Sequence, residues 1–134
     1  MQRVLVATDA DEVFDEIDAA LASPTCEVVR VRSGREVRTA VQDADPDLVV
    51  LDLQIGSMGG MATCMDLRLE EGAGRVEPQN ILMLLDRDAD VFLAERSDAD
   101  GWLIKPLDAG RVRRAAEALV AGDSYTETPR TAVG

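Results

Sequence analysis

Asp9, Asp52 and Lys105 each follow a short apolar stretch of the chain, and their side chains together could carry phosphoryl chemistry. Two carboxylates can hold a hard divalent cation such as magnesium, and an aspartate can act as a nucleophile that forms an aspartyl phosphate. A lysine can pair with a phosphoryl oxygen as a point charge. Lys105 is the only lysine among 14 basic residues, which indicates a position that needs a compact ammonium group.

The elements that would bring these residues together are visible in the hydrophobic pattern. Short, continuously apolar runs are typical of strands covered on both faces, as in a parallel sheet. Stripes of apolar residues at helical spacing alternate with these runs. The expected strands are Val4–Ala7, Val28–Val31, Leu48–Leu53, Ile81–Leu85 and a weaker Gly101–Ile104, and the expected helices have stripes that begin at Val13, Val37, Met61, Val91 and Val112.

This alternation predicts a three-layer α/β sandwich, because right-handed crossovers place helices on both faces of a parallel sheet. Ligands of such sheets bind outside the carboxyl ends of the strands, where the strand order reverses. Asp9, Asp52 and Lys105 all stand at such ends, so they are predicted to share one crevice. We expect a single domain over residues 1–121. Residues 122–134 are polar and aperiodic, and we expect them to form a flexible tail.

The overall composition narrows the classes of function. The formal net charge of −12 opposes binding to nucleic acid or to an anionic membrane, because either would need clustered Lys or Arg. The chain has no histidine, and Cys26 and Cys64 stand far apart, which excludes zinc fingers and Ser-His-Asp catalysis. No apolar stretch reaches the roughly 20 residues of a membrane helix and the first residues do not resemble a signal peptide, so we expect a soluble, cytoplasmic protein.

The sequence resembles the receiver domain of bacterial response regulators, with an actinobacterial-looking composition. The resemblance runs from Arg3 to about Gly122 and is carried by the segments LVATDAD, PDLVVLDLQIGSMGG and GWLIKPLD. It implies a flavodoxin-like (βα)5 three-layer sandwich with a parallel sheet in the order 2-1-3-4-5, and it implies signal transduction by phosphorylation.

The resemblance also implies a role for each site residue. Asp52 is expected to be the phospho-acceptor and Lys105 the residue that binds the phosphoryl group. Asp9, Asp52 and the backbone carbonyl of Gln54 are expected to hold magnesium. The peptide bond between Lys105 and Pro106 is expected to be cis, as in the family.

The chain departs from the family's pattern at several of these positions. Thr8 replaces one of a pair of acids, so we expect magnesium to bind weakly. Leu85 replaces the Thr or Ser whose hydroxyl bonds the phosphoryl group, and Asp86 replaces a small residue and could repel a phosphate. Trp102 stands at the position of the switch Tyr or Phe, and Gly56 replaces the usual Pro after the acceptor.

Some residues have a plainer interpretation beside the functional one. Asp52 could cap a turn. The role of Asp9 is less distinct, because the neighbouring Asp11 and Glu12 could be ordinary residues of a helix N-terminus, where acids are favoured. Trp102 is as well explained as a core aromatic as it is as a switch. A solvated helix face and a patch that docks a partner are both possible roles for Arg111, Arg113 and Arg114.

We therefore expect a non-enzymatic, single-domain response regulator that receives a phosphoryl group on Asp52 and acts through protein contacts. The expected partners are a sensor histidine kinase or another protein, with no nucleic acid and no membrane insertion. A dimer through the face of the fourth helix, fifth strand and fifth helix is a further expectation. One alternative is a pseudo-receiver, a binding module that does not depend on phosphorylation. An aspartyl-phosphate phosphatase is disfavoured, because Gln54 stands where that class has a second Asp.

Overall fold

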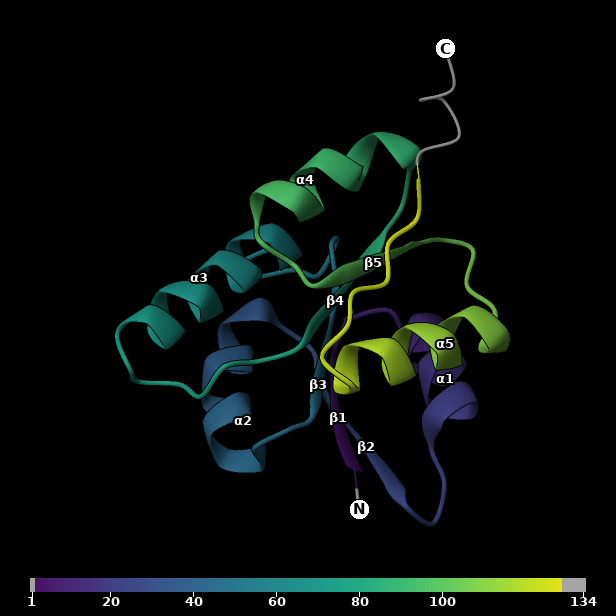
Figure 1. Ribbon diagram of the computed structural model, residues 1–134, viewed down its shortest axis with the longest axis horizontal. Coiled ribbons are helices and arrows are strands. Elements are labelled where there is room, and N and C mark those ends of the chain that lie inside the picture. The colour runs from purple at the N-terminus through teal and green to yellow at the C-terminus, as the bar shows by residue number, and fades with distance from the viewer. Residues whose placement is uncertain (1, 129–134) are drawn as a thin grey trace.

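The protein is a doubly wound α/β domain, seen in a computed structural model that describes residues 2–128 (Figure 1). The sheet has five parallel strands in the order β2-β1-β3-β4-β5, which confirms the predicted fold. The strands are β1 Gln2–Ala7, β2 Cys26–Val31, β3 Leu48–Asp52, β4 Ile81–Leu85 and β5 Gly101–Ile104, and the α-helices are α1 Asp11–Leu21, α2 Val37–Ala44, α3 Gly60–Gly72, α4 Val91–Arg96 and α5 Ala109–Val120.

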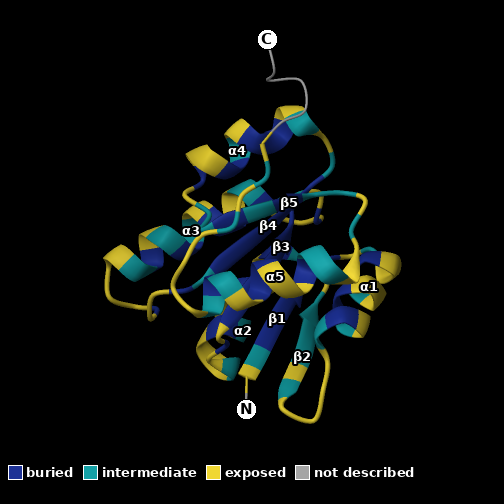
Figure 2. Ribbon diagram, turned by 45° about the vertical axis from the view of Figure 1, so that its right-hand side comes forward, coloured by how far each residue is buried: buried dark blue, intermediate teal, exposed yellow. Residues whose placement is uncertain are grey.

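The helices divide into two layers that cover opposite faces of the sheet (Figure 1). Helices α2, α3 and α4 pack on one face, where Leu51 belongs to the core cluster. Helices α1 and α5 pack on the other face, where Val50 belongs to a second cluster. Successive residues of β3 therefore point to opposite layers. Every residue of β3 and β4 is buried (Figure 2), which is why these strands read as continuous apolar runs.

The described part of the C-terminal segment differs from the mobile tail that the sequence predicts. Residues 122–128 run beside β5, the edge strand of the sheet, as the yellow end of the ribbon in Figure 1 shows. Tyr125 forms a parallel bridge with Gly101, and the Trp102 backbone N–H donates to the Tyr125 carbonyl at 2.9 Å. Polar residues suit this segment because it pairs at an edge and stays partly exposed. The part of the predicted tail at 129–134 lies outside the described residues.

Candidate phospho-acceptor site

Asp52 ends β3 as a buried carboxylate with 2% of its surface exposed. Its Oδ1 accepts hydrogen bonds from Lys105 Nζ at 2.9 Å and from the Gln54 backbone N–H at 3.1 Å. Its Oδ2 accepts a hydrogen bond from Thr8 Oγ1 at 2.7 Å. The structure thus brings Asp52 and Lys105 together at the carboxyl ends of β3 and β5, as the sequence predicts. A carboxylate that is bound on both oxygens is not a simple turn cap.

Thr8 stands at the end of β1, is fully buried, and holds the acceptor in place. Its Oγ1 accepts from the Ala10 backbone N–H at 3.1 Å, so the hydroxyl proton is free to be donated to Asp52. An acid in this position would put a second negative charge beside the buried Asp52 carboxylate. The replacement therefore exchanges a repulsive neighbour for a neutral donor.

Lys105 bridges two carboxylates. Its Nζ lies 2.9 Å from Asp52 Oδ1 and 3.1 Å from Asp86 Oδ1. Burial disfavours the charged ammonium, but the hydrogen bonds and charges of Asp52 and Asp86 outweigh burial and raise the pKa of Lys105 above its usual value. The peptide bond between Lys105 and Pro106 is cis, as expected.

Asp86 follows β4 and is paired with the lysine that the phosphoryl group would need. Its second oxygen, Oδ2, is buried and accepts no hydrogen bond from residues 2–128. The sequence indicates that this carboxylate could repel a phosphate. The structure adds that it competes for Lys105. The competition depends on the side-chain geometry of two separate loops, and no pattern in the sequence signals it.

Asp9 lies on the exposed rim of the site, where its Oδ2 accepts from the Gly56 backbone N–H at 3.1 Å. Gly56 can donate this hydrogen bond, whereas the Pro that the family usually has at this position could not, because Pro has no backbone N–H. Asp11 lies in the first turn of α1, as the plainer interpretation expects of an acid there, and pairs with Arg30 and Arg32.

A pocket of about 420 Å³ opens between these residues. Within residues 2–128 no group of three acidic, cysteine or histidine side chains converges closely enough to hold a metal ion by itself. Magnesium needs fewer protein ligands, because it usually keeps several waters and takes one or two carboxylates. The oxygens of Asp9 and Asp52 suit it chemically. The lining residues include Asp9, Glu12, Glu16, Asp52, Gln54, Asp86 and Lys105. Glu12 and Glu16 lie on α1, and nothing in the sequence singles them out as site residues.

Gly60 starts α3 directly against the acceptor strand. A Cβ atom built on Gly60 would lie 2.6 Å from the Asp52 carbonyl oxygen and 2.7 Å from the Leu53 Cα. Both neighbours are backbone atoms that cannot move aside. Glycine is therefore required at this position for the helix to begin so close to the site.

The two switch positions are both unusual. Leu85 is fully buried in the core cluster under α4 and offers no hydroxyl to the site. Trp102 is half-buried against the same cluster, and its indole N–H donates to the Glu127 carbonyl at 3.1 Å. The sequence offered no signal for this contact, because Glu127 falls in a segment without periodicity.

A buried aspartate and a lysine that meet at the switch point of a 2-1-3-4-5 sheet are the arrangement expected of a receiver-type signalling domain. The comparisons with known proteins agree. The sequence model of the response regulator receiver domain matches residues 4–117, and the chain belongs to that family.

Three relatives illustrate the likeness. The DNA-binding response regulator MtrA of Mycolicibacterium smegmatis is 30% identical over 96% of this chain and 60% of its own length. The nitrate/nitrite response regulator protein NarL of Escherichia coli K12 is 28% identical over 75% of this chain and 45% of its own length. The chemotaxis response regulator CheY4 of Vibrio cholerae has the same fold, with a TM-score of 0.76, 22% identity, and 89% and 98% of the two chains covered.

These relatives correct the predicted set of partners, which was restricted to proteins and excluded nucleic acid. MtrA is a DNA-binding regulator, so the exclusion is wrong. The physical reason is that the net charge of −12 describes this chain alone. The chain spans about half the length of the curated relatives, and its charge says nothing of the remainder. As for membranes, none of the helices within residues 2–128 is long and apolar enough to span one.

Proposed function

We propose that this receiver domain accepts a phosphoryl group on Asp52. The proposal rests on the 2.9 Å contact between the Asp52 carboxylate and Lys105. Both residues line a pocket that is also lined by other acids. A buried aspartate held by a lysine, a hydroxyl and a backbone N–H has the orientation that a nucleophile needs. A carboxylate with only a structural role would not need an open pocket beside it.

In the proposed reaction an Asp52 oxygen attacks the phosphorus of an acyl phosphate or similar donor. A new O–P bond forms, and the bond from phosphorus to the leaving group breaks, with the electron pair going to the leaving group. Lys105 then pairs with a phosphoryl oxygen. Magnesium, when bound by Asp9, Asp52 and the Gln54 carbonyl, would neutralise part of the phosphoryl charge.

The arrangement also makes the reaction slow. The phosphoryl group must compete with Asp86 for Lys105, whose ammonium is already bound by two carboxylates. Thr8 supplies no charge for magnesium. Asp9 must give up the Gly56 N–H before it can bind a cation. Loss of either contact, Lys105 with Asp86 or Gly56 with Asp9, costs on the order of 1 kcal/mol, the usual net value of one hydrogen bond.

A second candidate function is a protein module that keeps the fold and no longer uses phosphorylation. The observation that favours it is the same pairing of Asp86 with Lys105, which fills the phosphoryl-binding position with a carboxylate of the chain itself. Intact-mass measurement distinguishes the two functions.

The test is incubation with acetyl phosphate and magnesium, followed by intact mass and peptide mapping. We expect the mass of the unmodified protein to increase by one phosphoryl group and the mass of Asp52→Asn to stay unchanged. Asp86→Asn should label several-fold faster, because it releases Lys105. Asp43→Asn, the same charge change on the exposed side of α2, should label like the unmodified protein. An unchanged mass in all four proteins would overturn the proposal in favour of the second candidate. Equal labelling of Asp52→Asn would overturn it by placing the phosphoryl group on another residue.

A further inference from the structure

The outer edge of β5 is closed by the chain's own C-terminal segment. An edge strand presents unpaired backbone groups that can join other chains, and proteins often cover such an edge. Here the Trp102 N–H donates to the Tyr125 carbonyl at 2.9 Å, and the Ile104 N–H donates to Glu127 Oε1 at 2.6 Å. Both donors lie on the side of β5 away from β4, so the segment satisfies that edge as a short added strand would.

Gly122 sends the segment in this direction. The residue follows α5 with a φ of +87°, in the left-handed region that glycine adopts without strain. The Gly122 N–H donates to the Leu119 carbonyl, and the Asp123 N–H donates to the Ala118 carbonyl at 2.8 Å, which closes the end of the helix. The chain therefore turns back toward the sheet at a defined angle.

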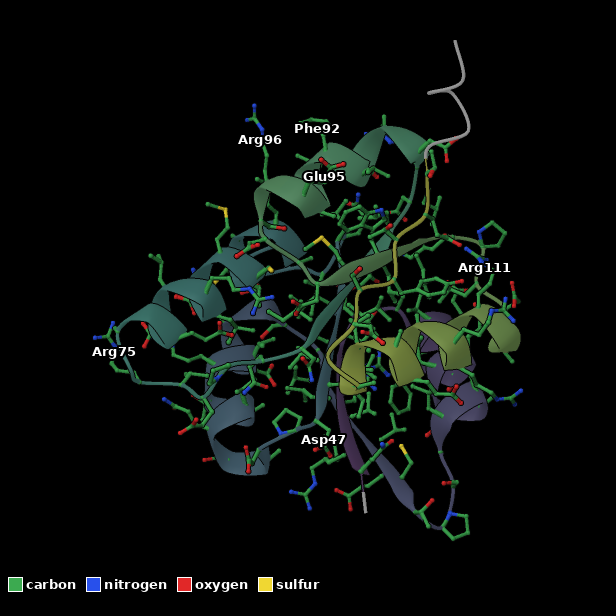
Figure 3. All side chains as sticks on the ribbon, viewed as in Figure 1. Asp47, Arg75, Phe92, Glu95, Arg96 and Arg111 are labelled. Carbon is green, nitrogen blue, oxygen red and sulfur yellow. The ribbon has the colours of Figure 1, made fainter. Side chains whose placement is uncertain are left out.

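Glu127 holds the far end of the segment. Its Oε2 accepts from Arg111 Nε at 2.8 Å, and its Oε1 accepts from Arg111 Nη2 at 2.6 Å, a fork that fits a carboxylate. Arg111 also donates to the carbonyls of Ile104 and Pro106, each at 2.8 Å. Figure 3 shows Arg111 on α5, beside the chain that arrives from β5. The arginine thus joins α5, the end of β5 and the C-terminal segment.

Trp102 is held by the same segment at two points. Its backbone N–H is bound by Tyr125 and its indole N–H by the Glu127 carbonyl at 3.1 Å. The ring cannot turn without breaking at least one of these bonds. The indole hydrogen bond therefore ties the position of the ring to the C-terminal segment.

We propose that residues 123–128 form a C-terminal clamp that closes the β5 edge and fixes Trp102, with the pairing of Glu127 and Arg111 as its lock. Release of this clamp, not phosphorylation, frees the aromatic side chain and exposes the edge of β5. The clamp does not depend on phosphorylation of Asp52, so the proposal stands if that function fails.

The test uses the full chain with Glu127→Gln, which keeps the shape of the side chain and removes its charge. Amide hydrogen exchange by NMR should be at least tenfold faster at Trp102, at its indole N–H and at Ile104, while the core amide of Val50 is unchanged. Trp102 fluorescence should shift to the red as the ring becomes wetter. Glu117→Gln, on the exposed side of α5, is the matched control and should behave like the unmodified protein.

A second variant guards against a general loss of stability. Arg111→Lys keeps the charge but loses the fork, and it should speed exchange at the same positions. Faster exchange at Val50 would show a general loss of stability in that variant, and the other variant would then be used to test the clamp. Exchange at Trp102 and Ile104 that stays at the unmodified rate in a folded variant would overturn the clamp, because the two N–H groups would then be protected without the lock.

Discussion

At the scale of single residues, the negative charges around Asp52 lie at other positions than in the family's usual pattern. Thr8 removes a carboxylate beside Asp52 and binds it through a hydroxyl instead. Asp86 adds a carboxylate on the opposite side, where it pairs with Lys105. Internal contacts therefore hold both Asp52 and Lys105 in place.

We predict that Thr8→Asp tightens magnesium binding about tenfold or more, corresponding to about 1.4 kcal/mol for a nearby ligand charge. Without magnesium the same variant should be less stable, because two carboxylates then meet in a buried place. Titration calorimetry measures the affinity, with Thr8→Val as the control that removes the hydroxyl without adding charge. Equal affinity for Thr8→Asp and the unmodified protein would show that position 8 does not limit the cation.

At the scale of elements, β3 is the central support of the site. It pairs with β1 and β4, and its residues serve both core clusters. Leu51, one residue before Asp52, is fully buried in the core cluster under α2, α3 and α4. A change in this strand should therefore affect stability and site together.

Leu51→Ala should cost about 2 to 5 kcal/mol of unfolding free energy, because it removes buried methyl groups and leaves a cavity. Leu69→Ala is the matched control on α3, where the side chain is 71% exposed, and should cost less than about 0.5 kcal/mol. Urea melts measure both. A Leu51→Ala cost below about 1 kcal/mol would be incompatible with a central strand.

The C-terminal clamp should depend on pH. Burial acts to raise the pKa of Glu127, but the Arg111 fork and the Ile104 N–H outweigh burial and Asp108, and hold the pKa below its usual value. Stability from a depressed pKa is fully present above the unfolded value, roughly pH 4.3 for glutamate, and is lost as the pH falls through the folded value.

The stability gap between the unmodified protein and Glu127→Gln should thus be about 1 kcal/mol near neutrality, since the pair is partly exposed. The gap should close as the pH falls below the usual pKa of glutamate and through the lower pKa of folded Glu127. Denaturant melts of both proteins at several pH values measure it. A gap that persists unchanged into acid would mean that charge does not hold the clamp.

At the scale of the whole molecule, the fold and the meeting of Asp52 with Lys105 followed from the sequence. Buried parallel strands leave continuous apolar runs, and topology places their carboxyl ends together. The pairing of Asp86 with Lys105, the bond from Gly56 to Asp9 and the clamp at Glu127 did not follow. They depend on which way individual side chains turn across separate loops, and no periodicity encodes that.

We propose that the Asp52 site can take a phosphoryl group but does not pass that change on to Trp102. A ligand shifts a two-state equilibrium only by its differential affinity for the two states. Leu85 has no hydroxyl with which to sense a phosphoryl group, and the clamp fixes the ring independently. Leu85→Thr with Asp86→Ala and Glu127→Gln restores the missing donor, frees Lys105 and loosens the clamp, and it serves as the responsive control.

Beryllofluoride with magnesium, a phosphoryl mimic, tests this most directly by NMR and tryptophan fluorescence. We expect shifted amides at Gln54 and Lys105, with Trp102 emission and the other amides of residues 91–112 almost unchanged. Large shifts across residues 91–112 and in Trp102 emission of the unmodified protein would contradict the disconnection, and no shift at Gln54 or Lys105 would contradict the acceptor site itself.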